Sequence, residues 1–190
     1  MTMILFKKIL AGAVLLLAFG LIGGCAGDVV NLHYVAVGPV LQSSGKQVTL
    51  LELDDRRPQA GAVGQRKDGG LFSSDVRVSD WVSRALADEF VRRGVQVYYA
   101  GEGVSSAGAP VISGSVDNLW LTETGNTSYD VDMKITLHLS DSNGKAIYTE
   151  SFWCKQNAQF FPSESNISNL MSDTLRDLVA PAAQAMGNRL

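Results

Sequence analysis

The densest group of charged side chains in this sequence is the run Asp54, Asp55, Arg56 and Arg57, two carboxylates followed by two guanidinium groups. An arginine can bind a carboxylate or a phosphate through two parallel hydrogen bonds, and a neighbouring aspartate can hold the arginine in place. These four residues are therefore the candidate binding site of the chain. The alternative is that they pair with one another and only fix the shape of the loop that follows.

Cys25 is the second position to which the sequence assigns chemistry. Lys7 and Lys8 precede an apolar run from residue 9 to 22, and Gly23-Gly24-Cys25 follows it, which is the order of a secretory signal. The cysteine makes this segment resemble a bacterial lipoprotein signal. That resemblance implies cleavage after Gly24, glycerides on the Cys25 sulfur and a further acyl chain such as palmitate on the new amino terminus.

A lipid anchor fits this segment better than a membrane-spanning helix does. A transmembrane helix needs about 20 consecutive apolar residues, whereas this run is shorter and ends in Gly-Gly-Cys. Acyl chains contribute about 0.8 kcal/mol per buried methylene, so more than one chain anchors a protein stably. In enterobacterial lipoproteins an aspartate directly after the cysteine retains the protein in the inner membrane. Ala26 at that position implies the outer membrane, with the protein on its periplasmic face.

Other reactive residues are sparse. Of the two cysteines, lipidation of Cys25 leaves Cys154, which we interpret as a small buried hydrophobe, with an intermolecular or redox thiol as the alternative. His33 and His138 belong to no His/Cys cluster, so we expect no metal site. No nucleophile elbow, metalloprotease motif or phosphate-binding loop occurs, and we therefore expect neither an enzyme nor a cofactor.

The charge of the chain excludes one class of partner. Its net charge is −3, and the basic residues form no cluster of the kind that nucleic-acid-binding proteins carry. We expect three parts: a signal peptide at 1–24, a lipidated leader and tether at 25–47, and a single periplasmic domain at 48–190. Within the leader, Val30 to Ala36 form either a short strand or a stretch laid on the edge of the domain.

A strand, a helix and a second strand place the charged run in the fold. Val48–Leu53 is nearly continuously apolar, as buried parallel strands are. Residues 59–75 are Gly-rich and predict a surface loop with a small hairpin around Gly69 and Gly70. A helix is expected from Asp80 to Arg93 with Ser79 as its N-cap, and a parallel strand from Val95 to Tyr99 after it. Asp54 to Arg57 then lie at the carboxyl end of a parallel strand, where α/β sheets bind ligands.

The rest of the chain predicts three antiparallel strands and a second helix. The strands are expected at Val111–Thr122, around residues 130–139 and after a three-residue hairpin loop at Asp141–Lys145. That loop predicts an inward face of Ile147, Thr149, Ser151 and Trp153, whereas a two- or four-residue loop would exchange the two faces. The helix is expected from Asn166 to Met186. Phe160 and Phe161 precede it and form either a lid on the core or a contact with lipid or a partner.

These elements predict an α/β (α+β) fold. The expected order is strand, helix, four strands, helix, with one mixed sheet of about five strands and both helices packed on one face.

Over its mature length the chain resembles the YajG-like family of small bacterial outer-membrane lipoproteins. The features that match are the lipobox at Cys25, Val30-Asn31-Leu32-His33-Tyr34, the strand ending in Asp54 to Arg57, Val63-Gly64, Arg93-Gly94-Val95, the Asp141–Lys145 hairpin and the final amphipathic helix. The family implies an outer-membrane lipoprotein facing the periplasm and implies no catalytic residue.

The function expected from the sequence is therefore non-catalytic. We expect a protein held to the membrane through the lipid on Cys25 that binds another protein of the cell envelope. One alternative is an auxiliary lipoprotein of an envelope ABC transport system, which a more distant likeness suggests. The alternative of a different class is a cell-envelope hydrolase.

Overall fold

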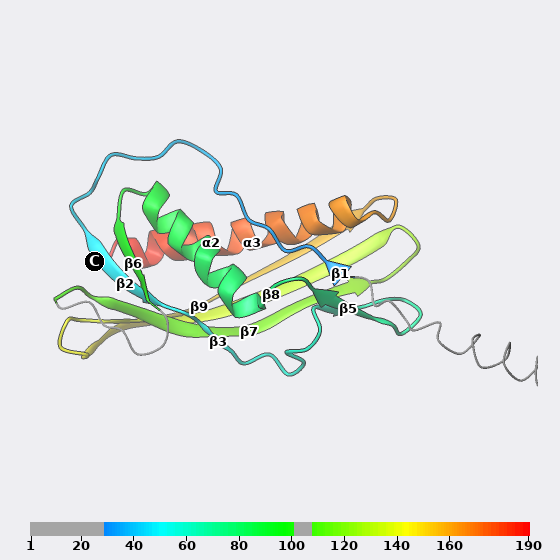
Figure 1. Ribbon diagram of the computed structural model, residues 1–190, viewed down its shortest axis with the longest axis horizontal. Coiled ribbons are helices and arrows are strands. Elements are labelled where there is room, and N and C mark those ends of the chain that lie inside the picture. The colour runs from blue at the N-terminus through cyan, green and yellow to red at the C-terminus, as the bar shows by residue number, and fades with distance from the viewer. Residues whose placement is uncertain (1–28, 101–107) are drawn as a thin grey trace, which may run out of the picture.

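The computed structural model describes residues 29–100 and 108–190, and within these ranges it contains nine strands and two helices (Figure 1). The helices are α2 (Val78–Arg92) and α3 (Glu164–Gly187). The strands are β1 (Val29–Val30), β2 (Gln47–Leu51), β3 (Asp54–Asp55), β4 (Gly64–Gln65), β5 (Leu71–Ser74), β6 (Gln96–Ala100), β7 (Val111–Glu123), β8 (Ser128–Ser140) and β9 (Ala146–Gln159).

The sheet is mixed, and the fold class expected from the sequence is confirmed. β2 is parallel to β6 on one side and to β7 on the other, so β2, α2 and β6 form the expected crossover. β7, β8 and β9 form an antiparallel meander of long strands. Both helices lie on the same face of the sheet and pack against each other, α2 over β2, β6 and β7, and α3 over β8 and β9 (Figure 1).

The expected number of about five strands was too low. β1, β3, β4 and β5 are the additional strands, and each has only two to four residues. Segments this short are not long enough to show a recurring alternation of apolar and polar residues. β4 and β5 form the expected small hairpin, in which Arg66 N donates to Gly70 O.

The core lies between the sheet and the helices. The apolar side of the alternation in β8 is buried, including Ile135 and Leu137, and so are the helical residues Leu86 and Leu175. The apolar stripes of both helices are therefore the surfaces that pack on the sheet.

The predicted inward face of β9 was wrong. The hairpin loop has the expected form, with Asp141 paired to Lys145 and Gly144 at φ +81°. However, Ser140 pairs with Ala146 while Leu139 pairs with Tyr148, so Ile147 is an extra residue in a β-bulge. One extra residue exchanges the two faces of the strand. Ile147 and Trp153 are consequently 50% and 70% exposed, while Tyr148, Phe152 and Cys154 lie against the core.

The start of α2 also differs from the expectation. The N-cap residue is Arg77, which makes no side-chain capping bond, and Ser79 is the second residue of the helix. The Ser79 hydroxyl instead donates to Glu52 Oε1 over 3.0 Å. The end of the helix at Arg93 and Gly94 is as expected, with Gly94 at φ +75°.

Residues 31–46, which we call the strap, cross the outer side of the helices without regular secondary structure. Leu32 is buried, and the Tyr34 hydroxyl donates to Glu89 Oε1 over 2.7 Å. Burial and this hydrogen bond raise the pKa of Tyr34. Further along, Leu41 N donates to Arg92 O and Ser44 N donates to Gly94 O, each over 2.8 Å. The strap is thus fixed to α2 along much of its length.

Candidate functional site

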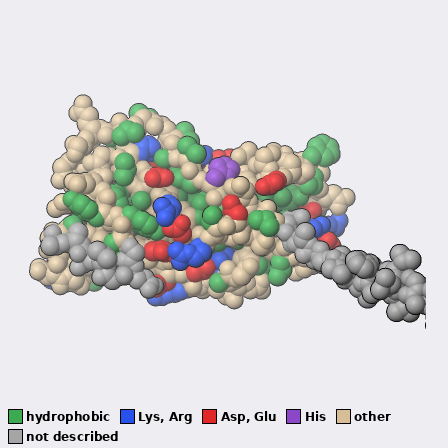
Figure 2. All heavy atoms as spheres, in the orientation of Figure 1, with side chains coloured by type: hydrophobic (Ala, Val, Ile, Leu, Met, Phe, Trp, Pro, Cys, Tyr) green, Lys and Arg blue, Asp and Glu red, His purple; other side chains and the backbone are tan. Residues whose placement is uncertain are grey.

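A cleft of about 1130 Å³ opens where β2 and β3 end. Its walls come from the end of β2, from β3, from the end of β5 and from the first residues of α2. The lining residues are Glu52, Leu53, Asp54, Asp55, Arg56, Ala60, Gly61, Ser73, Ser74, Asp75, Val76, Arg77, Val78 and Ser79. Acidic and basic side chains gather on this face of the molecule (Figure 2). Three of the residues expected at the end of the strand, Asp54, Asp55 and Arg56, therefore line this cleft.

Asp54 and Arg56 are the exposed pair of the charged run. Arg56 Nη2 lies 3.1 Å from Asp54 Oδ2, and the two side chains are 65% and 59% exposed. A pair this exposed contributes at most about 1 kcal/mol to stability, because water and salt screen it. Both side chains can therefore exchange this contact for one with a ligand at little cost.

Asp55 and Arg57 form an internal pair. Arg57 Nε and Nη2 donate to the two carboxylate oxygens of Asp55 over 2.9 and 2.8 Å. The same guanidinium donates to the backbone oxygens of Ala60 and Ala62, and Arg57 is 7% exposed. Its hydrogen bonds close the loop after β3, so for Arg57 the structural role outlined from the sequence holds.

The electrostatics of Asp55 follow from this geometry. Burial raises the pKa of the Asp55 carboxyl, but the hydrogen bonds from the side chain and backbone of Arg57 outweigh that effect and hold the pKa below its ordinary value. Asp55 therefore stays charged to a lower pH than a free aspartate does.

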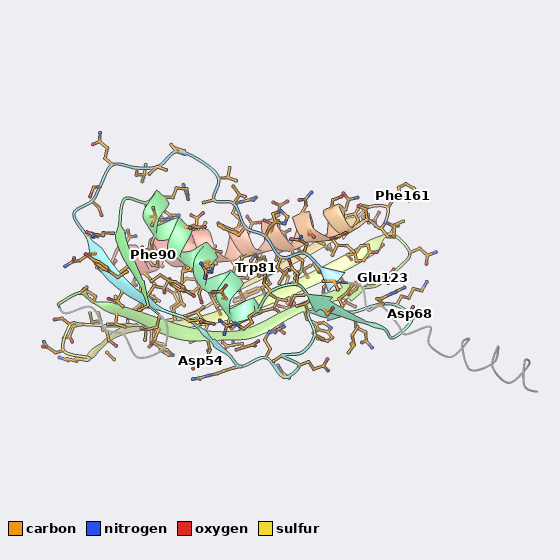
Figure 3. The ribbon with its side chains drawn as sticks, in the orientation of Figure 1. Asp54, Asp68, Trp81, Phe90, Glu123 and Phe161 are labelled. Atoms are coloured by element: carbon orange, nitrogen blue, oxygen red, sulfur yellow. The ribbon has the colours of Figure 1, made fainter. Side chains whose placement is uncertain are left out.

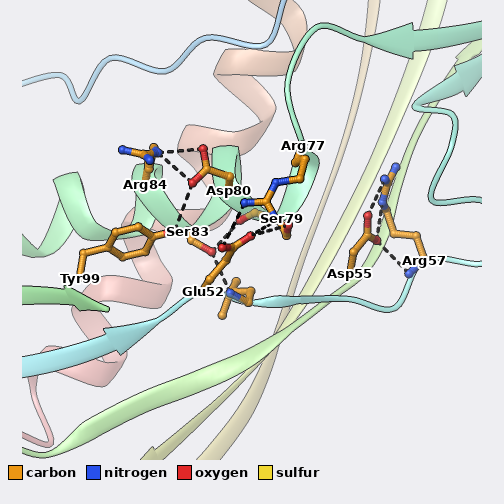
Figure 4. Close-up of polar contacts among 10 residues, drawn as sticks. Glu52, Asp55, Arg57, Arg77, Ser79, Asp80, Ser83, Arg84 and Tyr99 are labelled. Carbon is orange, nitrogen blue, oxygen red and sulfur yellow. Dashed lines mark hydrogen bonds and ion pairs between the residues drawn. The ribbon is translucent and has the colours of Figure 1, made fainter. Parts of the chain in front are cut away.

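A second charged group on the opposite wall was missed by the sequence analysis. Arg77 Nη1 lies 3.0 Å from Glu52 Oε1, the oxygen that also accepts from the Ser79 hydroxyl (Figure 4). These two contacts fix the Glu52 side chain, whereas the Arg77 side chain is 72% exposed. One feature of the sequence points to this group. Glu52 precedes the loop that connects the strand to the helix, and Arg77 is the last residue of that loop.

Beside the cleft, α2 carries a further pair that does not line it. Arg84 Nε bonds both carboxylate oxygens of Asp80, and its guanidinium lies 5.6 Å from the centre of the Tyr99 ring (Figure 4). Burial and the nearby Asp80 carboxylate raise the pKa of Tyr99. Arg84 is 65% exposed, the same fraction as Arg56, which makes it a matched reference for that residue.

The charged side chains that line the cleft are suited to binding a charged partner. Arg56 and Arg77 present guanidinium groups from two walls, and Asp54 and Asp75 add acceptors between them. This is suited to a partner that carries both carboxylates or phosphates and hydrogen-bond donors. In residues 29–100 and 108–190 no three His, Cys, Asp or Glu side chains are placed to hold a metal ion.

Two other residues singled out from the sequence, His138 and Cys154, lie away from the cleft. His138 Nδ1 is 2.9 Å from Thr149 Oγ1 on the open face of the sheet. Cys154 is a free, partly buried thiol whose pKa is raised by burial and by the nearby carboxylates of Asp177 and Asp132. Cys25 lies outside the described residues.

Comparison with known proteins shows the fold and no family. No protein-family model matches the chain, and no curated protein matches its sequence closely enough to count as a relative. Protein XCC0632 from Xanthomonas campestris, a DUF330 protein, is similar with a TM-score of 0.60 and 10% identity over 82% of this chain and 92% of that one. An uncharacterized protein is similar with a TM-score of 0.57 and 10% identity, over 84% and 99% of the two chains.

A minor lipoprotein from Acinetobacter baumannii matches less well, with a TM-score of 0.47 and 16% identity over 76% of this chain and 95% of that one. At such identities the likeness to the first two proteins shows a shared fold alone. Among the described residues, neither helix is long and apolar enough to span a membrane.

Proposed function

We propose that this chain is a lipid-anchored, non-catalytic lipoprotein of the bacterial envelope that binds another envelope component through the charged cleft. We place it in the YajG-like family, on the periplasmic face of the outer membrane. The anchor is supported by the order of charged, apolar and small residues before Cys25. The observation that carries the binding role is the cleft itself, with Asp54 and Arg56 exposed at its mouth.

The anchor is tested by Cys25→Ala. We expect this variant to be released from the membrane fraction or to remain as an unprocessed precursor. Wild-type fractionation and mobility would contradict the anchor.

The binding role is tested by photo-crosslinking in cells. Ala60 is exposed and lines the cleft, so a photo-crosslinking amino acid at position 60 samples whatever occupies it. The same amino acid at Asn143, exposed in the distant β8–β9 hairpin loop, is the positional control. We expect one defined envelope protein to be captured from position 60 and not from position 143.

Three arginine variants separate binding from stability. Arg56→Gln should abolish capture and change the unfolding free energy by less than about 1 kcal/mol, because the side chain is exposed. Arg84→Gln, equally exposed but outside the cleft, should retain capture. Arg57→Gln removes the buried guanidinium that bonds Asp55 and the backbone oxygens of Ala60 and Ala62, and should cost about 1–3 kcal/mol, the range for leaving buried polar groups without a partner. Capture that survives Arg56→Gln would leave the charged run with a structural role only.

The identity of the captured protein decides between the remaining readings. A subunit of an inner-membrane transport complex would favour an auxiliary role in transport. Turnover of a cell-wall or lipid substrate by the purified protein, lost on a single substitution, would replace the non-catalytic proposal with a hydrolase.

A further inference from the structure

One end of the molecule brings together four segments that are far apart in the sequence. Lys67 Nζ in the β4–β5 turn lies 3.1 Å from Asn126 Oδ1 in the β7–β8 turn. Phe160 N, after β9, donates to Thr127 O over 2.8 Å. β1 lies at the same end, beside β5 (Figure 1). We call this surface the tether end; it consists of β1, residues 66–71, residues 124–127 and residues 160–162.

The chain enters the domain at the tether end. β1 is parallel to β5 with Val29 opposite Ser73, so the amino end of β1 lies on the side where β5 begins, next to the β4–β5 turn. Cys25 precedes Val29 by four residues. Four residues span at most about 14 Å even when fully extended. A lipid on Cys25 therefore keeps Val29 within about 14 Å of the point where the lipid enters the bilayer.

The tether end also exposes apolar side chains. Phe161 is 84% exposed, Val29 is 53% exposed and Leu71 is 50% exposed, all large and hydrophobic. Figure 3 shows Phe161 pointing outward from this end. Such side chains contribute little to the fold, but each gains free energy when it moves from water into the acyl boundary of a membrane.

Phe161 is exposed because its neighbours are fixed, not because the segment is loose. The ring of Phe160 stacks on Tyr129 with the ring centres 4.8 Å apart. Asn166 Nδ2 donates to Phe161 O over 3.2 Å, and the Ser163 hydroxyl caps α3 by accepting from Asn166 N. Phe160 is thus the lid on the core, and its successor is held outward. Of the two roles considered from the sequence for this pair, the lid therefore belongs to Phe160.

We propose that the tether end rests on the lipid bilayer, with Phe161 inserted between the headgroups and Leu71 and Val29 beside it. This inference rests on the proposed lipid anchor. The occupant is a phospholipid surface because the short connection to Cys25 puts that surface within reach and because the charges at this end are balanced. Arg66 pairs with Asp68, and the charge of Lys67 is matched by the nearby carboxylate of Glu123, which accepts from the Lys67 backbone N–H, so the contact needs no anionic lipid.

Depth-dependent fluorescence quenching tests the proposal on the full lipidated protein. In a Cys154→Ser background the sulfur of Cys25 is held in a thioether, so one introduced cysteine takes a thiol-reactive fluorophore. The labelled positions are Phe161→Cys, Leu71→Cys and, as control, Val40→Cys, which is 73% exposed on the strap near Arg92. Each protein is reconstituted into phosphatidylethanolamine–phosphatidylglycerol vesicles that contain a phospholipid with a nitroxide at a shallow acyl carbon.

We expect the nitroxide to quench the fluorophores at 161 and 71 and to leave the fluorophore at 40 unchanged. Circular dichroism of each labelled protein confirms that it is folded. Absence of quenching at 161 in protein that co-floats with the vesicles overturns this inference and leaves the anchor intact. Equal quenching at 40 and 161 overturns it as well. If the amino-terminal peptide carries no lipid by mass spectrometry, the proposed function fails first, and this inference fails with it.

Discussion

Replacing Gly94 with alanine is the sharpest test of how the strap is packed. Gly94 has φ +75°, and a Cβ at this position would lie 2.1 Å from Gln42 O and 3.2 Å from Ser44 N. Gly144 provides a matched control, since it has φ +81° and a Cβ there meets nothing within 4 Å. The two substitutions thus share the backbone penalty and differ in the contact with the strap.

The expected magnitudes follow from these two terms. A left-handed conformation costs an L-residue about 1–2 kcal/mol, partly offset by the lower entropy of the unfolded alanine chain, about 0.4–1 kcal/mol. Gly144→Ala should therefore cost about 1 kcal/mol. At Gly94 the chain must also shift away from the new methyl group, and overpacking of this kind costs about 1–3 kcal/mol more. Gly94→Ala should then cost about 2–4 kcal/mol.

Equilibrium unfolding in urea measures both values, and limited proteolysis reports on the strap directly. Ser44 donates to Gly94 O through its backbone N–H and through its hydroxyl, so displacement of the strap breaks both bonds. We expect protease cleavage within residues 36–46 to become faster in Gly94→Ala only. Equal free-energy costs for the two variants, with unchanged cleavage, would refute a strap that is packed on the end of α2.

Three further predictions test the packing and the charged run. Leu86→Ala should lower the unfolding free energy by about 2–5 kcal/mol, because it is a buried large-to-small change. His138→Ala, on the open face of the sheet, should lower it by less than about 1 kcal/mol. The reverse order in urea titrations would mean that the faces of the sheet are misassigned. Trp153→Ala should cost less than Phe152→Ala because only the phenylalanine packs on the core, which a thermal unfolding comparison decides. Folding lowers the pKa of Asp55, so the stabilisation from its charge is present above about pH 4 and is lost as the pH falls through the folded pKa. Asp55→Asn should therefore weaken the fall of the unfolding free energy at acidic pH. An unchanged pH dependence in this variant would contradict the pairing with Arg57.

The sequence was most informative where apolar residues recurred with one regular spacing over a long segment. β8 alternates strictly and α3 carries a continuous stripe, and both are placed as expected. β9 was harder because both of its faces carry aromatic residues, Trp153 on one and Phe152 on the other. The choice then depended on the register, and the bulge at Ile147 changed it. A bulge leaves no mark on composition, so pattern reasoning cannot locate it.

The candidate cleft could be predicted only in part from the sequence. The end of a parallel strand is a general position for binding, and it led to Asp54 and Arg56. It did not separate Arg56 from Arg57, because only the folded loop places the Ala60 and Ala62 oxygens beside Arg57 and buries its side chain. Glu52 and Arg77 were missed because their contact depends on where α2 begins, and the helix starts before its expected Ser79 cap.

The direction of β1 determines how the domain bears a mechanical load. Tension applied along the axis of β1 acts parallel to β5, because the two strands pair in parallel. Leu32 N also donates to Asp75 Oδ1, and Asp75 N donates to Val30 O, on the same line. These bonds are loaded together in shear and do not open one after another, as they would in a strand peeled from its end. The contact by which the chain enters the domain is therefore arranged to resist pulling, although β1 has only two residues.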